Sequence, residues 1–164
     1  MNRNVGPLLL GFSLAFASCS QRGIERSKPI STGCVRGEPE ALLASRSEFK
    51  KSSPDEALES VQVESRIKLT IRHFGCTHYA LDFEFTWPDA RMPEPRVSLN
   101  EAADVLDKLP LKETYRPVMK SLSAAVRKMA QEPYKQPMAM SETETLTATT
   151  PALNVLRVRY DVAL

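Results

Sequence analysis

The feature that most constrains the fold is a long run of alternating apolar and polar residues, interrupted once by a glycine-containing turn. The alternation covers residues 61–73 and resumes over residues 77–87. Its apolar positions are Val61, Val63, Ile67, Leu69, Ile71, Tyr79, Leu81, Phe83, Phe85 and Trp87. A period of two is typical of a strand with one buried face. The sequence therefore predicts a β-hairpin whose turn is Phe74-Gly75-Cys76.

The length of this turn predicts which residues pair across the hairpin. A three-residue loop places His73 opposite Thr77, and its glycine supplies the left-handed position that such a loop needs. In this register His73 lies on the apolar face, whereas His78 lies on the opposite face near Arg72. We therefore expect the two histidines of the chain to be unable to share one metal ion or one catalytic centre.

Two helices and a second hairpin are predicted beyond a proline-rich loop. A capping box and an apolar stripe predict the first helix over residues 98–109. The second helix is expected over residues 114–129, with Thr114 as its cap, and strands are expected over residues 143–149 and 156–162. The order ββααββ predicts an α+β fold, in which an antiparallel sheet carries both helices on one face.

Two shorter helical segments are predicted ahead of the first hairpin. A helix over residues 39–50 would place Pro39 at the first helical position, where proline is tolerated. Ser53-Pro54-Asp55-Glu56 resembles a capping box at the start of another helical turn. Both predictions depend on local start signals alone.

The N-terminus has the composition of an export signal. A positively charged head, residues 1–4, precedes the apolar residues 5–17, which are too few to span a bilayer as a helix. The alternative is a buried N-terminal helix of the mature fold, which Gly6, Pro7 and Gly11 would weaken. Export is therefore the favoured interpretation.

The end of this stretch, Phe16-Ala17-Ser18-Cys19, resembles the lipobox of bacterial lipoproteins. The resemblance covers residues 1–19 and implies cleavage before Cys19, with diacylglyceryl on its sulfur and a further acyl chain, such as palmitate, on its new amino group. Phe16 stands where the family usually has leucine. Two or three acyl chains anchor a protein stably to a membrane. Ser20 in place of aspartate favours the outer membrane, with the domain on its periplasmic face.

These features divide the chain of 164 residues into three parts. Residues 1–18 are the expected signal peptide, and residues 19–33 comprise the lipidated cysteine and a polar tether. Residues 34–164 are expected to form a single α+β domain, because that length suits one ordinary hydrophobic core.

Two carboxylates on the outer face of the first hairpin invite an acid/base interpretation. In the expected register Asp82 faces Lys68 and Glu84 faces Arg66, so cross-strand salt bridges are the better interpretation. The cysteines and histidines lack the spacing of a zinc site. We therefore expect no catalytic residue, no metal and no cofactor.

Motif comparison points the same way. Ser47 to Lys50 and Ser65 to Lys68 both match the S-x-x-K pattern of penicillin-binding proteins, but no S-D-N or K-T-G element accompanies them. The 6 glycines are too scattered for a phosphate-cradling loop. The near balance of 22 basic and 20 acidic residues argues against a nucleic-acid partner.

Two functions stay open on the sequence. The first is a membrane-anchored envelope lipoprotein that binds a protein or the cell wall without catalysis, as an assembly factor, inhibitor or immunity-type protein. The second is a small cell-wall or envelope hydrolase with an unfamiliar site. A concave pocket holding His73 beside a carboxylate or hydroxyl would favour the hydrolase. An exposed apolar patch would favour the binding role.

The three cysteines generate a prediction. Lipidation of Cys19 leaves Cys34 and Cys76, 42 residues apart, which we expect to form a disulfide in an oxidising compartment. A loop of this length contributes about 4 kcal/mol in the chain-entropy model. Alkylation of the oxidised protein, read by mass spectrometry, should find neither thiol free, and the two Cα atoms should lie within about 7 Å. Alkylation at both thiols would contradict the pairing.

Overall fold

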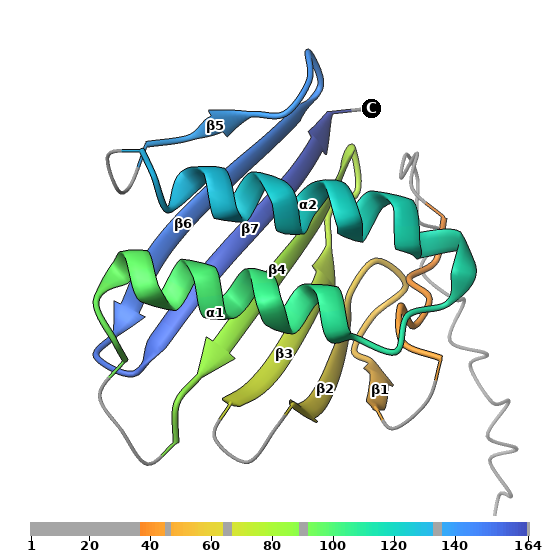
Figure 1. The fold of residues 1–164 in the computed structure, drawn as a ribbon. Helices are drawn as coiled ribbons and strands as arrows, with labels where there is room; N and C mark the ends of the chain where they lie inside the picture. Colours follow the sequence, from red (N-terminus) through yellow and green to blue (C-terminus); the bar gives the residue numbers. More distant parts are fainter. Residues whose placement is uncertain (1–36, 45–46, 64–66, 89–91, 133–135, 164) are drawn as a thin grey trace, which may run out of the picture. The chain divides into compact units, whose positions relative to one another are not determined.

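The computed structural model describes residues 37–44, 47–63, 67–88, 92–132 and 136–163. They form one antiparallel sheet of seven strands with two helices on one face (Figure 1), which is the α+β class predicted from the sequence. The strands are β1 (Glu48–Lys51), β2 (Ala57–Val63), β3 (Ile67–Phe74), β4 (His78–Thr86), β5 (Met138–Ala139), β6 (Glu144–Ala152) and β7 (Val155–Ala163). The helices are α1 (Pro95–Lys108), α2 (Arg116–Met129) and the short 3-10 helix η1 (Glu113–Tyr115). The predicted signal peptide, Cys19, the tether and Cys34 lie outside the described residues.

The strand order across the sheet is β1-β2-β3-β4-β7-β6-β5. The chain builds one half of the sheet, crosses its face with both helices, and then builds the other half. The last strand therefore pairs with β4 at the centre, where Phe83 lies between Ile71 of β3 and Val158 of β7. The predicted C-terminal hairpin is confirmed as β6–β7. β6 begins one residue later and ends three residues later than expected, and β7 is one residue longer at each end.

The alternating stretch before Gly75 forms two strands, so the prediction of one strand over residues 61–73 is wrong. β2 and β3 pair with each other, with Val63 opposite Ile67. The interruption falls where Ser65 occupies a position that the alternation would have made apolar. The apolar period is unchanged across the break, so both strands still bury the same face.

The first predicted hairpin is confirmed as β3–β4, but its predicted register is wrong. His73 pairs with Leu81 rather than Thr77. Gly75 has a φ of 108°, and a Cβ atom there would lie 2.3 Å from the carbonyl oxygen of His78, so the tight turn requires glycine. His78 and Tyr79 pair with β7 instead of β3, which lengthens the connection. The shift is by an even number of residues, so the buried face is the predicted one.

The two helical segments predicted ahead of the sheet are wrong. Residues 48–51 form edge strand β1, and Leu43 makes an isolated antiparallel bridge with Leu111. The backbone N–H groups of this segment bond to distant groups rather than to carbonyls four residues back, as shown by Ala44 N donating to Pro110 O at 2.7 Å. Residues 52–56 form the bend between β1 and β2, where Ser53 Oγ contacts Asp55 Oδ1 at 2.5 Å.

Both predicted helices are present, with different starts. α1 begins at Pro95, ahead of the predicted capping residue Ser98, whose hydroxyl donates to the Pro93 carbonyl at 2.9 Å. Thr114 lies in η1 and does not cap α2. None of the helices among the described residues is long and apolar enough to cross a membrane.

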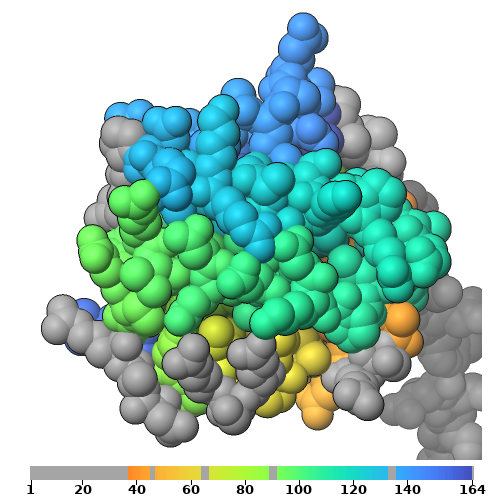
Figure 2. Space-filling model, in the orientation of Figure 1, coloured from red at the N-terminus to blue at the C-terminus, as the bar shows by residue number. Residues whose placement is uncertain are grey.

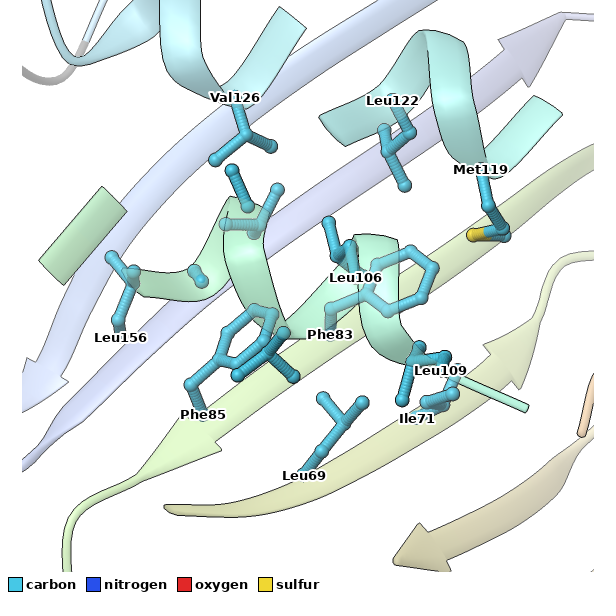
Figure 3. Packing of buried hydrophobic residues seen from close by; sticks show 14 of the residues in the cluster. Leu69, Ile71, Phe83, Phe85, Leu106, Leu109, Met119, Leu122, Val126 and Leu156 are labelled. Carbon is cyan, nitrogen blue, oxygen red and sulfur yellow. The ribbon is translucent and has the colours of Figure 1, made fainter. Parts of the chain in front are cut away.

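The core lies between the helices and the inner face of the sheet, and Figure 3 shows its centre. The helices supply Leu106, Met119, Leu122 and Val126, which face Phe83 and Phe85 of β4. The largest fully buried side chains are Phe83, Phe85, Leu42, Leu69, Ile71, Leu81, Leu99, Leu106, Met119, Leu122, Leu146 and Leu156. Leu42 belongs to the N-terminal segment, so that segment is part of the core.

A polar contact joins the two helices at the edge of this core. Ser123 of α2 donates to Asp107 of α1 at 2.5 Å, and Arg127 contacts both Asp104 and Asp107 at 2.7 Å. The Ser123 hydrogen bond lowers the pKa of Asp107 more than partial burial raises it, with Arg127 adding to the lowering. Figure 2 shows the outer surface that these two helices form.

Cys76 lies in the turn between β3 and β4 and is disulfide-bonded. The chain has two further cysteines, Cys19 and Cys34, and both lie outside the described residues. The pairing of Cys34 with Cys76 therefore stays a prediction.

Candidate functional site

A completely buried carboxylate, Glu59 of β2, is the most unusual polar feature among the described residues. Its Oε2 accepts the backbone N–H of Leu42 at 2.9 Å, and its Oε1 accepts the N–H of Leu43 at 3.1 Å. The hydroxyl of Ser47 also donates to Oε1, at 2.7 Å. Glu59 thereby fixes residues 42–44, named here the N-terminal strap, against the inner face of the sheet.

His73 of β3 is the nearest titratable neighbour of Glu59. Its Nε2 lies 3.6 Å from Glu59 Oε2, and both side chains are almost completely buried. This separation is too long for a hydrogen bond of ordinary geometry, and Nε2 has no other partner among the described residues. We treat the contact as electrostatic. The ring of His73 meets Phe49 edge to face, with centroids 5.8 Å apart.

Glu59 retains its charge despite its burial. Desolvation alone raises the pKa of a buried carboxyl, but the contacts with His73, Ser47 and the two backbone N–H groups outweigh it and hold the pKa of Glu59 below its usual value. The carboxylate is therefore ionised at neutral pH.

A cavity of about 250 Å³ lies beside this pair. Residues 37–40 form one wall, and His73, Tyr79 and Tyr115 contribute the others. Glu38 and Glu40 are exposed and lie toward the solvent side. Glu59 does not line the cavity itself, so His73 separates the buried carboxylate from the open space. The arrangement could orient a histidine for proton transfer or for binding a polar group.

The predicted separation of the histidines is confirmed. His73 faces the core, whereas His78 is about half exposed on the other face. The predicted neighbour of His78 is wrong, because its Nε2 lies 4.0 Å from Asp161 rather than beside Arg72. The S-x-x-K matches bring no site together. Ser47 faces Glu59, while Lys50 pairs with exposed Leu58 on the other face, and Ser65 lies outside the described residues.

Asp82 and Glu84 form salt bridges, as predicted, but with partners from β7. Asp82 receives two hydrogen bonds from Arg159, at 2.7 and 3.0 Å, and Glu84 receives one from Arg157 at 2.9 Å. The predicted partners were wrong because the register is shifted and because β7, rather than solvent, borders β4. Lys68 faces Thr86, and Arg66 lies outside the described residues.

The sheet face away from the helices is polar and internally paired. Two guanidinium groups lie over the ring of Phe74, with Arg159 at 4.8 Å and Arg72 at 5.3 Å from the ring centroid. Exposed large apolar side chains among the described residues come from four separate places: Leu58, Val97, Val118 and Leu153. They belong to β2, α1, α2 and the turn between β6 and β7, respectively.

Sequence reasoning missed Glu59, although a signal was available. Glu59 shares the parity of Val61 and Val63, so an extended β2 places a carboxylate on the buried face. Among the described residues, no group of three or more Cys, His, Asp and Glu side chains could hold a metal ion.

Comparisons with known proteins assign no relative to this chain. No protein-family model, curated protein or solved structure matches it. The site is therefore interpreted from its own geometry.

Replacement of Glu59 by glutamine should destabilise the protein at neutral pH by about 2–4 kcal/mol, since an amide nitrogen would face backbone donors. Because the pKa of Glu59 is lowered on folding, its contribution is present above the unfolded-state pKa and is lost as the pH falls through the folded-state pKa. Wild type should therefore lose more stability than Glu59→Gln between neutral pH and pH values below 4.5, the pKa of an unperturbed glutamate.

Urea unfolding at several pH values measures both effects. The matched control is Glu132→Gln, at an exposed position just after α2, which should change stability by less than about 0.5 kcal/mol. Equal stabilities of wild type and Glu59→Gln at neutral pH would show that the buried carboxylate does not hold the strap.

Proposed function

We propose that this protein is a membrane-anchored lipoprotein of the bacterial cell envelope that binds another macromolecule without catalysis. The observation that carries the proposal is the lipobox-like sequence ending at Cys19, behind a charged head and a short apolar stretch. An assembly factor, an inhibitor or an immunity-type protein would each fit this role. The partner is a protein or the cell wall, and nucleic acid is not part of the proposal.

The domain architecture supports a binding role. Its two helices cover one sheet face, which leaves the paired polar side chains of the described part of the other face available to a partner. Salt bridges such as Arg157–Glu84 hold these groups in fixed positions without a net excess of one charge. The disulfide at Cys76 is in keeping with an oxidising compartment such as the periplasm.

Replacement of Cys19 by alanine tests the anchor. The variant should lack acyl mass on its N-terminal peptide and should move from the membrane fraction to the soluble periplasm, because two or three acyl chains supply the membrane affinity. Mass spectrometry of the N-terminal peptide and fractionation of the envelope measure both outcomes. Cys34→Ala is the matched control and should stay lipidated. A wild-type protein that begins elsewhere and carries no lipid would refute the proposal.

A second candidate is a small envelope hydrolase, and one observation favours it. The cavity beside His73, with Glu59 behind the ring, is the concave pocket expected of such an enzyme. Against it, the Ser47 hydroxyl donates to Glu59 instead of to His73, so no nucleophile–histidine pair is formed there. The structural role of Glu59 also accounts for its position without catalysis.

Incubation of the lipidated protein with isolated cell-wall material distinguishes the two candidates. The binding proposal predicts sedimentation with the wall or with a wall-associated protein, and no soluble fragments above the buffer control. Fragment release that is lost in His73→Gln and retained in His78→Gln would replace the binding proposal with the hydrolase. Circular dichroism of both variants confirms that they remain folded.

A further inference from the structure

The cavity beside His73 carries an inference that does not depend on the proposed function. It is small, at about 250 Å³, which is below the range usual for drug-sized ligands. It is also built on a side chain with a buried polar atom: His73 is 1% exposed, and its Nε2 has no hydrogen-bond partner among the described residues. A slim polar ligand fits these limits better than a bulky one.

The charge behind the cavity belongs to Glu59, whose carboxylate lies 3.6 Å from the ring of His73. Glu59 is ionised and completely buried, and its hydrogen-bond donors are two backbone N–H groups and one hydroxyl, all of them neutral. Within the described part of the chain no lysine or arginine forms an ion pair with it. A buried charge without a counter-ion is costly, and its field in a low-dielectric surrounding favours a cation nearby.

The ring of His73 transmits the effect of the Glu59 charge to the cavity. Because Nε2 faces the carboxylate of Glu59, a neutral ring carries its proton on Nε2. Nδ1 is then a hydrogen-bond acceptor. A ligand that donates a hydrogen bond to Nδ1 satisfies this acceptor. A positively charged ligand is in addition attracted by the negative charge of Glu59.

The remaining walls agree with a cationic ligand. Tyr79 and Tyr115 contribute aromatic side chains, which attract cations. Lys51 lies 2.7 Å from Glu38 and neutralises it, whereas Glu40 has no ion-pair partner among the described side chains. No described lysine or arginine lines the cavity. The carboxylates of Glu40 and Glu59 therefore favour a cationic ligand over an anionic one.

We propose that this cavity binds a primary ammonium group at the end of an unbranched alkyl chain. An ammonium ion has three donors and a compact charge, and an alkyl stem can lie along the tyrosines. Such a group is found on lysyl side chains and on simple alkylamines, and the same chemistry would recognise either.

Binding of n-butylammonium to the full-length protein in non-ionic detergent tests the proposal. Selective ¹³C labelling of histidine and tyrosine rings allows NMR to follow the site, with His78 as an internal reference on the other face. We expect saturable shifts at His73, Tyr79 and Tyr115, with a dissociation constant of millimolar order, and no shift at His78. Butanol, which has the same shape without the charge, should bind at least about fivefold more weakly.

Several outcomes would overturn the proposal. These are equal binding of butanol, absence of saturation at tens of millimolar ammonium, and equal shifts at both histidines. A His73 ring that carries both protons at neutral pH would also overturn it, since that ring would already compensate Glu59.

Glu40→Gln should weaken butylammonium binding several-fold, and the charge-matched control Glu132→Gln should leave it unchanged. Equal loss in both variants would indicate diffuse attraction and would also refute a site. A lysine-containing peptide then shows whether a side-chain ammonium enters as the free amine does.

Discussion

The ionised carboxylate of Glu59 is the interaction on which the rest of the N-terminal half depends. A buried anion must be surrounded by donors, and two of its donors are backbone N–H groups of the strap. The strap in turn accepts the Lys112 N–H at the Leu42 carbonyl, in the connection between the helices. One side chain on β2 thus aligns the strap with both the sheet and the helical layer. The buried side chain of Leu42 completes the same junction.

The sequence pattern was sufficient to predict the fold class, because the alternation of apolar residues identifies the buried face even where the register is predicted wrongly. Residues 67–87 bury the same side chains whether His73 pairs with Thr77 or with Leu81. Register itself could not be predicted, because it depends on β7 arriving from the far end of the chain to pair with His78 and Tyr79. Loop length alone carries no information about that third strand.

The candidate site was harder to predict than the fold, for a specific reason. Once β2 is recognised as a separate strand, the alternation of its residues is enough to place Glu59 on the buried face. Its main partners, however, are backbone groups of Leu42 and Leu43, and backbone donors leave no signature in a sequence. Start signals for a helix at Pro39 were locally valid, but the donors that a helix would have used internally are taken by Glu59 and Pro110.

The position of the strap decides how a pulling force on the N-terminal side of the chain would reach the sheet. If Cys19 carries the proposed lipid anchor, a pull from the membrane reaches the domain from the N-terminal side of the strap. Along the backbone, that force meets the Leu42–Lys112 hydrogen bond and the two backbone bonds to Glu59 before it reaches β1. The disulfide at Cys76 provides a second, covalent path to the turn between β3 and β4. Edge strand β1 has only four residues, and a force applied at its end would open it bond by bond. The buried carboxylate therefore holds the strap in place between the proposed lipid anchor and the sheet.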